Sequence, residues 1–587
     1  MKKIFCAIAA LMLALASFAQ NNGPSQYFLN AYKAYEEGNL ELALQYIQKQ
    51  CEEEECDFQT RYLTMLVCYK AGEYEVAGML AQQLLPNLKK DAHEERSDLY
   101  VYMAVAAFEK NDQKGAIKLL NKALKEAPRS SWIFYERGYV YAHQKRFDAA
   151  IKDLQASFYL DSTRIEALTL MGTCYQYKGN QQEMARCYEE AIRRTEGKQP
   201  YIWCEYSAAH FELGQIDQAI DKLFTAILIN PNDARTGRMY NNIQRKNKPE
   251  LLARLKQKAE EEPKSATWHS LLGDTYQEMD SLKQAYHHYR IASLLEPTYD
   301  GGVTPLKRLA QAYAEAEDYD AAIALLDEGL EASPMELVYH RLKQVYTHSK
   351  GQVADALTMV ERLILFDEKQ HDELLFISAR YLYDLGRYEE SMAKCLELMK
   401  TDFKTVPDYT LLMGKLYAHM GKTAESDDNF RILLKDAEKF YDYAAMKPIG
   451  ITKENAEQLG PFSLPRALMG LGRTDQAQEV VTYMNKKIND VLREHPDVQI
   501  KGSLLYNLAC VNAQTGLLSE ALDMLDLADR FGYSKAVYMQ HDPDFEPVLR
   551  SGDSDILLRW QQICDRIAAA NQAKAAVIHE ATDGVKL

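Results

Sequence analysis

The stretch of sequence that decides the fold is residues 98–130, DLYVYMAVAAFEKNDQKGAIKLLNKALKEAPRS. Small residues stand twelve positions apart in it, at Ala104 and Ala116; a third follows at Ala123, and Pro128 comes five positions later. Apolar residues fill the intervals at helical spacing. This pattern predicts two helices joined by a turn, and proline ends the second helix because it has no N–H to donate.

The same pattern recurs along nearly the whole chain. Ala104 is followed by Gly138 and then by Gly172, each 34 residues further on. A small residue on the first helix lets the second helix approach closely, and one hairpin cannot bury its apolar face alone, so neighbouring units must stack. The clear units lie near 98–130, 132–163, 166–197, 201–232, 267–298, 304–335, 373–402, 408–437 and 503–532, with turn glycines at one offset: Gly38, Gly72, Gly179, Gly214, Gly386, Gly421 and Gly516.

Many such units in phase resemble the tetratricopeptide repeat family. The resemblance implies an all-α fold, an α-solenoid in which helical hairpins form a right-handed superhelix. A C-terminal capping element is expected as well. Asp542 followed by Pro543 predicts a helix start there, because the side chain caps the helix and proline fits the first turn.

Two stretches break the phase of the repeat. Residues 297–305 contain two glycines and two prolines, which predicts a hinge near 298–305. The larger break, Met446 to Pro465, carries five glycines and prolines. The predicted organisation is therefore a signal peptide (1–19), a repeat array (20–445), an irregular linker (446–465), C-terminal repeat-like helices with a cap (466–570) and a flexible tail (571–587).

The N-terminal residues have the pattern of a secretory signal. Lys2 and Lys3 precede an uncharged run from Ile4 to Ala16, and Ser17-Phe18-Ala19 offers small residues for cleavage. The run is too short to span a bilayer, and no later run approaches 18 apolar residues, so no transmembrane segment is expected after cleavage. The expected location is the periplasm of a bacterium or the outside of the cell.

Composition and charge exclude several classes of protein. Apolar residues make up 47% of the chain and charged residues 26%, which excludes global disorder and a multi-span membrane protein. The formal net charge is −16, and a nucleic-acid partner is excluded because it needs a concentrated basic surface. Of the ten cysteines, Cys51 and Cys56 are the best candidate for a disulfide, although most cysteines also fit as small buried apolar residues.

Residues that could carry chemistry are sparse, and no nucleotide, zinc-protease or hydrolase motif occurs. His287 and His288 point about 100° apart on a helix, so they chelate poorly together. Helix capping explains Asp542 and Asp544 beside His541 better than acid–base chemistry does. The sequence therefore predicts a protein that is not an enzyme and has no catalytic, cofactor-binding or metal-binding residues.

The resemblance to tetratricopeptide repeats implies that the first helix of each hairpin lines an inner, concave groove. Aromatic residues are dense on the helices assigned to this face, which suits an extended peptide or a helix of a partner, although several rings also fit a core role. The lysine–asparagine clamp of some relatives has no counterpart, because Lys307, Arg380 and Lys415 are scattered. The candidate partner-binding residues are Val101, Val105, Phe108, Trp132, Tyr135, Tyr139, His143, Tyr177, Tyr201 and Phe211.

The function expected from these features is that of a non-catalytic, exported scaffold. It would bind a protein or peptide of the cell envelope through the groove. Two alternatives remain open at this point: an accessory factor for outer-membrane assembly or secretion that uses the convex surface, and a glycan-binding module in which tyrosine faces stack on sugars.

Overall fold

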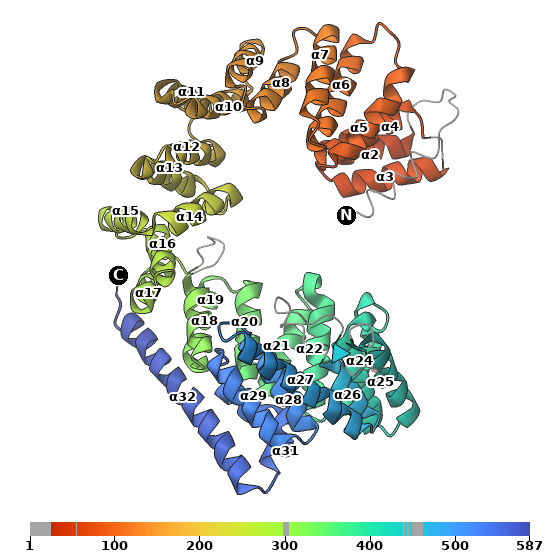
Figure 1. Cartoon of the computed structure of the whole chain (residues 1–587), viewed down its shortest axis with the longest axis vertical. Helices are drawn as coiled ribbons and strands as arrows, with labels where there is room; N and C mark the ends of the chain where they lie inside the picture. The colour runs from red at the N-terminus through yellow and green to blue at the C-terminus, as the bar shows by residue number, and fades with distance from the viewer. Residues whose placement is uncertain are drawn as a thin grey trace. The chain divides into compact units, whose positions relative to one another are not determined.

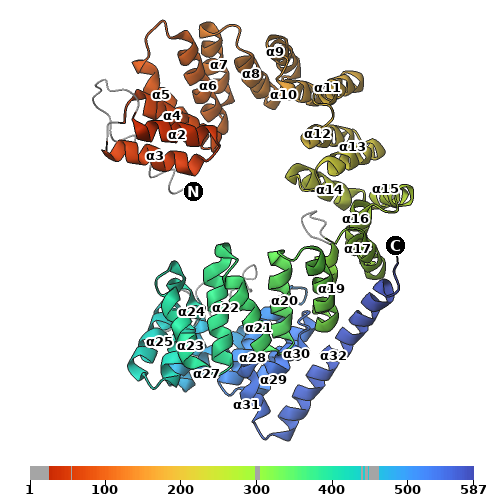
Figure 2. The same ribbon diagram turned by 180° about the vertical axis from the view of Figure 1, so that it is seen from behind.

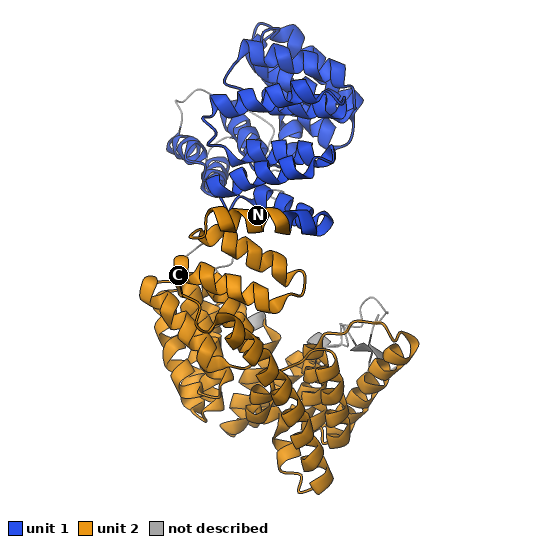
Figure 3. Ribbon diagram, turned by 90° about the vertical axis from the view of Figure 1, so that its left-hand side faces the viewer, with its two compact units in different colours: residues 1–251 blue, residues 252–587 orange. Residues whose placement is uncertain are grey.

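The computed structural model describes residues 25–53, 56–297, 305–437, 441–442, 447–448 and 462–586. The predicted signal peptide, nearly all of the predicted hinge and most of the predicted linker lie outside these residues. The chain divides into two compact units, Met1–Leu251 and Leu252–Leu587, which Figure 3 shows in two colours. This division falls inside the array that the sequence predicts as one body over 20–445.

Unit 1 consists of helical hairpins that follow one another along the chain (Figure 1). The hairpins are α2 (Gln26–Glu36) with α3 (Leu40–Glu53), α4 (Phe58–Lys70) with α5 (Tyr74–Leu84), α6 (His93–Glu109) with α7 (Gln113–Glu126), α8 (Ser131–His143) with α9 (Phe147–Leu160), α10 (Ile165–Tyr177) with α11 (Gln181–Arg194), and α12 (Pro200–Glu212) with α13 (Ile216–Ile229). The short η1 (Leu85–Asn87) follows α5, and α14 (Ala234–Lys246) and α15 (Lys248–Glu261) come last; the division between the units lies within α15.

Unit 2 continues with hairpins and ends in a different arrangement. Its hairpins are α16 (Ala266–Gln277) with α17 (Leu282–Leu295), α18 (Pro305–Glu315) with α19 (Tyr319–Ala332), α20 (Leu337–Ser349) with α21 (Val353–Ile364), α22 (His371–Asp384) with α23 (Tyr388–Leu398), α24 (Pro407–His419) with α25 (Thr423–Ala437), α26 (Ser463–Gly470) with α27 (Thr474–Glu494), and α28 (Gly502–Gln514) with α29 (Leu518–Arg530). Short elements are η2 (Glu368–Gln370), η3 (Asp402–Thr405) and an antiparallel pair, β1 (Tyr441–Asp442) with β2 (Lys447–Pro448); the closing segment is α30 (Ala536–His541), η5 (Pro543–Phe545), α31 (Glu546–Leu549) and α32 (Ser554–Thr582).

This architecture confirms the predicted all-α fold of repeated hairpins. Gly172 on α10 faces the ring of Tyr188 on α11, and a Cβ at Gly172 would lie 2.7 Å from Tyr188 Cε2. Gly273 on α16 faces Tyr289 on α17 in the same way, with a Cβ distance of 2.4 Å to Tyr289 Cδ1. Each ring stands sixteen positions after its glycine. A small residue is therefore required where the two helices of a hairpin approach.

The turns inside the hairpins use a positive φ at one position, which comes seven residues after the small residue of the first helix or, for Gly72, seven residues after Met65. The seven predicted turn glycines have φ between +70° and +83° there. Where no glycine is present, Asn111, Lys145, Asp280 and Glu317 hold the same position with φ between +55° and +62°. Side chains with a Cβ rarely adopt this conformation, so these four turns cost more backbone strain than a glycine turn does.

The last helix returns to the first hairpins of unit 2. α32 lies beside α17 and α18 in both ribbon views (Figures 1 and 2). The Tyr313 hydroxyl on α18 donates to Thr582 Oγ1 at 2.8 Å, since Thr582 itself donates to Ile578 O. His579 Nε2 lies 2.9 Å from Asp318 Oδ2 in the following turn. These contacts hold the C-terminal end of α32 against α18 and against the turn between α18 and α19.

The flexible tail predicted for 571–587 is therefore wrong over residues 571–582. These residues continue α32, and Ile578 is buried in the cluster formed by α17, α18 and α19. The prediction failed because the tail carries no repeat motif and its partners stand more than 250 positions earlier in the sequence. Among the described residues, no helix is both long and apolar enough to cross a membrane.

Candidate binding site

Aromatic rings from consecutive first helices of unit 1 contact one another edge to face. Tyr69 of α4 lies 4.9 Å from Tyr102 of α6, measured between ring centroids, and Tyr102 lies 5.4 Å from Trp132 of α8. Tyr102 is buried, whereas Tyr69 and Trp132 are half-buried. Edge-to-face pairs at these distances favour one fixed arrangement of the rings. The rings thus join three hairpins into one aromatic surface.

A second aromatic group lies about two to three turns further along α6 and α8. Phe108 contacts both Tyr139 and His143, at centroid distances of 5.5 Å and 5.1 Å. Tyr139 and His143 lie 4.5 Å apart, and the His143 side chain is exposed. Trp132, Tyr139 and His143 recur at helical spacing, so they lie on the same side of α8.

Carboxylates are interspersed with these rings. Trp132 Nε1 donates to Glu136 Oε1 at 2.9 Å, and burial raises the pKa of Glu136 although this hydrogen bond and Arg164 oppose the shift. On α6, burial raises the pKa of Asp98 to about 6, helped by the nearby charges of Glu94 and Glu95. Burial is the cause because it removes water from the charged form.

Glu205 of α12 is a third carboxylate of this kind. Burial raises its pKa, while a hydrogen bond with Thr169 and the charge of Arg235, 3.8 Å away, lower it. The charges of both Glu136 and Glu205 act on Tyr135 of α8 and help to raise the pKa of its hydroxyl.

We call this surface of rings and carboxylates the aromatic–acidic face. It comprises Tyr69, Asp98, Trp132, Tyr135, Glu136, Tyr139, His143 and Glu205.

Two arginines partly balance the charge of the face. The Arg164 guanidinium lies 5.7 Å from the ring centroid of Tyr135, and its Nε donates to Ser131 Oγ. Arg235 lies over the ring of Tyr201 at 5.6 Å. The face retains an excess of carboxylates over cations. Rings with electron-rich faces beside carboxylates form a surface that attracts cations.

The structure distributes the ten sequence-predicted residues unevenly. Val101 is fully buried in the core shared by α6, α7 and α8, so its assignment to an exposed groove is wrong. Phe211 is also buried, and Lys246 Nζ lies 5.4 Å above its ring. Both errors concern register, because a shift of one position on a helix turns a side chain by about 100°. The half-buried residues are Val105, Phe108, Trp132, Tyr135, Tyr139 and Tyr201.

The two remaining predicted residues are exposed but lie apart. His143 belongs to the aromatic–acidic face. Tyr177, at the end of α10, is 64% exposed and stacks on Phe147 of α9 at 5.3 Å with an interplanar angle of 3°. Tyr177 thus covers a neighbouring helix instead of joining the rings of α4, α6 and α8.

One group of side chains in unit 2 has the composition of a metal site. The ligand atoms of Cys510, Asp542 and Asp544 lie within 4.8 Å of one another. Both carboxylates are already engaged: Tyr506 donates to Asp542 Oδ2 at 2.6 Å, and Arg466 Nη2 lies 3.0 Å from Asp544 Oδ2. Burial raises the pKa of the Cys510 thiol far above its usual range, which opposes the thiolate form that binds metals. The chemistry of this group fits a structural cluster.

The capping interpretation is confirmed for Asp542 but not for Asp544, whose carboxylate accepts from Arg466 and Gln514 instead. Asp542 caps η5, with Oδ1 accepting from the backbone N–H of Asp544 at 2.9 Å. His287 and His288 do not converge on a common point either. His288 Nδ1 lies 3.0 Å from His269 Nδ1, whereas His287 Nδ1 lies 3.3 Å from the carbonyl oxygen of Ala581.

Sequence reasoning missed the carboxylates of the face. Asp98, Glu136 and Glu205 stand among ordinary charged residues of amphipathic helices, and charged positions on a helix are usually solvated. A signal was available in their spacing, because Asp98 stands four positions before Tyr102 and Glu136 four positions after Trp132. Residues four apart share one side of a helix.

Comparisons with known proteins agree with the hairpins seen in the structure. Residues 103–160 and 165–197 each match a model of the tetratricopeptide repeat. A TPR repeat-containing protein of Methanocaldococcus jannaschii is 28% identical over 132 residues, which are 22% of this chain and 22% of that protein. The chain thus spans about a fifth of the length of this curated relative.

Two solved structures also show likeness over short stretches. The structure of YrrB, described as a TPR protein with an unusual peptide-binding site, is 19% identical, with 33% of this chain and 96% of that chain covered and a TM-score of 0.25. A MamA structure from Desulfovibrio magneticus RS-1 is 18% identical, with 29% and 94% covered and a TM-score of 0.25.

The hairpin architecture and the two repeat matches define the class: this chain contains tetratricopeptide repeats within a fold of repeated helical hairpins. Proteins built from such repeats are generally non-catalytic scaffolds that bind protein or peptide partners. Stacked repeats present an extended surface, which is suited to binding a segment of another protein.

Proposed function

We propose that this chain is a non-catalytic scaffold that binds a partner protein through the aromatic–acidic face of unit 1. The observation that carries the proposal is the pairing of Trp132 with the half-buried Glu136, with Asp98 and Glu205 on nearby first helices. A carboxylate held partly out of water is stabilised when a cation reaches it. The expected partner segment is therefore basic, with Lys or Arg side chains and apolar residues between them.

The experiment measures the affinity of two labelled peptides for the full chain. One peptide alternates lysine and leucine, and the other alternates glutamate and leucine. The basic peptide should bind, and the double substitution Glu136→Gln with Glu205→Gln should weaken it about tenfold, a loss of about 1.4 kcal/mol. Glutamine keeps the size of the side chain and an acceptor for Trp132 Nε1.

The matched control is Glu189→Gln on α11, which removes one exposed carboxylate outside the face. This variant should bind as the unaltered chain does. Equal binding of both peptides, or equal loss in the control and in the double variant, would contradict the proposal. A thermal midpoint for each variant separates lost binding from lost folding.

The aromatic part of the face has its own test. Tyr139→Ser removes a half-buried ring that contacts Phe108 and His143 but does not belong to the buried core. We expect Tyr139 to be one of the few hot-spot residues of the interface, where loss of a ring costs about 2 kcal/mol or more, so affinity should fall at least about thirtyfold. Unchanged affinity in this variant would remove the rings of α8 from the proposed interface.

The proposal includes an envelope location for the chain and its partner. Its support is the sequence alone: Lys2 and Lys3, the uncharged run and the small residues before Gln20. A C-terminally tagged full chain should appear in the periplasmic or extracellular fraction and should begin at Gln20 by N-terminal sequencing. Recovery of the intact N-terminus in the cytosol would contradict this part.

A further inference from the structure

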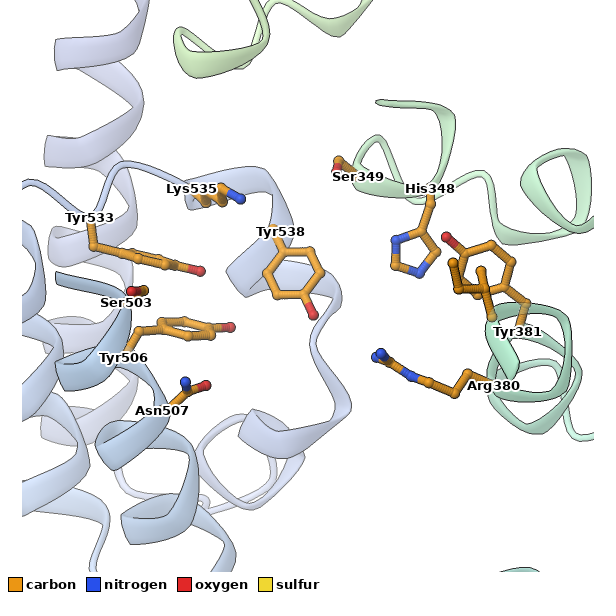
Figure 4. Close-up of a pocket in the computed structure, with 11 residues that line it drawn as sticks. His348, Ser349, Arg380, Tyr381, Ser503, Tyr506, Asn507, Tyr533, Lys535 and Tyr538 are labelled. Carbon is orange, nitrogen blue, oxygen red and sulfur yellow. The ribbon is translucent and has the colours of Figure 1, made fainter. Parts of the chain in front are cut away.

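Unit 2 contains a cavity of about 380 Å³ between its repeats and its closing segment. Figure 4 shows two facing walls: α20 and α22 on one side, and α28 with the segment that enters α30 on the other. A volume of this size suits a small molecule. The lining residues that matter are His348, Arg380 and Tyr381 on the first wall and Tyr506, Lys535 and Tyr538 on the second.

The charges of the lining have one sign. Arg380 and Lys535 come from opposite walls, and no carboxylate is among the lining residues. Within the described parts of the chain, neither cation has a hydrogen bond or a close ion pair, although the charge of Asp384 acts on Arg380. This is unusual in a chain with a formal net charge of −16. Two unpaired cations that face one cavity create an attractive potential for an anion.

The nearest carboxylates do not neutralise this potential fully. Asp542 accepts from Tyr506, and Asp544 accepts from Arg466 and Gln514. Asp384 stands one turn after Arg380 on α22, and burial raises its pKa even though Arg380 lowers it. Asp542 and Asp544 therefore serve other partners, and Asp384 acts on Arg380 only through its charge. None of the three carboxylates lines the cavity, whereas both cations do.

The remaining lining is aromatic and held in place. Tyr506 stacks on Tyr533 with ring centroids 4.2 Å apart and an interplanar angle of 11°. His348 stacks on Tyr381 at 4.3 Å, and burial lowers the pKa of His348 to about 4, so the ring is neutral at pH 7. The Tyr538 ring lies between the two walls in Figure 4. Such faces pack against a planar or apolar body.

We propose that this cavity binds a small organic carboxylate. Its carboxylate lies between Arg380 and Lys535, and its body packs against Tyr506 and Tyr538. Arginine suits this role because its planar fork matches the two oxygens of a carboxylate. This proposal does not depend on the aromatic–acidic face of unit 1, since every residue of the cavity belongs to unit 2.

The test uses the full chain and isothermal titration with matched probes. The probes are acetate, benzoate, glucuronate and N-acetylphenylalanine, and the uncharged carboxamide of N-acetylphenylalanine. At least one carboxylate with a ring should bind in the millimolar range or tighter, and the carboxamide should bind at least about tenfold more weakly. Equal binding of acid and amide, or no binding of any carboxylate, overturns the proposal.

Substitutions of the two cations test whether the carboxylate binds in this cavity. Arg380→Gln and Lys535→Gln should each weaken the best probe about tenfold or more. Both side chains are exposed, so the variants should fold, and thermal midpoints without ligand check this. The control, Arg493→Gln, removes one cation from an exposed site on α27, where its side chain is 72% exposed. Equal weakening by all three variants overturns the assignment to this cavity.

A final comparison identifies the source of the carboxylate. A pentapeptide that ends in phenylalanine with a free carboxyl group presents the same chemistry as N-acetylphenylalanine. Tighter binding of the peptide assigns the site to the end of a polypeptide, whereas binding no tighter than that of the small acid assigns it to a free small molecule. Tyr538→Ala, which removes the ring that packs against the body of the ligand, should reduce affinity in either case.

Discussion

Asn571 of α32 donates from Nδ2 to Glu317 Oε2 at 2.9 Å, although the two residues stand 254 positions apart. The other oxygen of Glu317 accepts from the backbone N–H of Val537 at 2.9 Å. Glu317 holds a turn position at φ +55°, where other hairpins have glycine. The two hydrogen bonds of the Glu317 side chain join the closing segment to the α18–α19 turn, and they offset the backbone strain of this turn.

The first prediction concerns this joint. Asn571→Ala should destabilise unit 2 by about 1–3 kcal/mol, because the partly buried Glu317 carboxylate then loses a donor. Amide hydrogen exchange should accelerate in α32. The control is Gln572→Ala, the exposed neighbour of Asn571 on the same helix. Equal exchange in both variants would show that the joint does not hold α32.

The second prediction concerns the close approach inside a hairpin. Gly273→Ala places a Cβ 2.4 Å from the Tyr289 ring, and Tyr289 cannot easily move because its hydroxyl donates to Asp274 at 2.7 Å. The expected loss of stability is about 1–3 kcal/mol, measured by urea denaturation. Gly237→Ala on α14 is the control; nothing lies within 4 Å of its Cβ, so it should be neutral or stabilising by up to about 1 kcal/mol.

The third prediction concerns acid stability. Burial, with the nearby charges of His269, His287 and Lys256, lowers the pKa of His288 from 6.5 to about 3. Below pH 6.5 the unfolded chain therefore binds a proton at His288, whereas in the folded chain His288 stays neutral until the pH approaches 3. The free energy of unfolding consequently falls as the pH drops towards 3. At pH 5 this residue alone accounts for about 2 kcal/mol.

His288→Asn should flatten this dependence. Urea midpoints at pH 7.5 and pH 5 measure it, and His143→Asn, at an exposed site, is the control. The substitution should lower stability at pH 7.5 and reduce the further loss at pH 5. An unchanged difference between the two pH values would mean that His288 is not buried in its neutral form.

The fourth prediction concerns the proposed interface of unit 1. The pKa of Asp98 is raised to about 6, so its carboxylate is charged at pH 7.5 and largely neutral at pH 5. Affinity for the lysine–leucine peptide should fall as the pH drops through 6, because one attractive charge is lost. In Asp98→Asn the affinity should be lower at pH 7.5 and less dependent on pH. A profile identical to that of the unaltered chain would exclude Asp98.

The fifth prediction concerns the cysteine pair chosen from the sequence. Cys51 and Cys56 are buried and hydrogen-bonded to each other, which lowers the pKa of Cys56, with a further contribution from Arg61. Glutathione disulfide should oxidise the pair: one protein disulfide forms and two molecules of reduced glutathione are released. Mass spectrometry should show the loss of two hydrogens.

Two cysteine variants test whether the disulfide forms between Cys51 and Cys56. Cys51→Ser should prevent the internal disulfide, whereas Cys395→Ser, at a buried thiol of α23, should leave it unchanged. Burial raises the pKa of Cys395 to about 12, which makes this thiol a poor nucleophile. Persistence of two free thiols at 51 and 56 under oxidising conditions would contradict the prediction.

The hairpins could be predicted from the sequence because their causes are local. Gly172 and its turn glycine, Gly179, are seven residues apart, and the packing partner of Gly172, Tyr188, follows within the same unit. Helical spacing places such residues on one face without knowledge of the rest of the chain. The cap at Asp542 was predictable for the same reason, since a capping side chain accepts from a backbone N–H only two or three positions further along the chain.

The candidate site was predicted only in part. Trp132 and Tyr139 lie on the face as expected, but Val101 belongs to the core and Asp98 was overlooked. Charged side chains that are half-buried by neighbouring hairpins look like solvated ones in a sequence. Their altered pKa values arise from the packing of other helices around them, which a helical pattern does not contain.

The sequence by itself determined the repeated hairpin, because small residues, turns and apolar stripes act over a few dozen positions. Tertiary structure alone decided that α32 returns to α17 and α18, and that Arg380 and Lys535 face one cavity. Those relationships join residues more than 150 positions apart. Their free energy comes from burial and hydrogen bonds between distant segments, and such contacts leave no periodic signal in the chain.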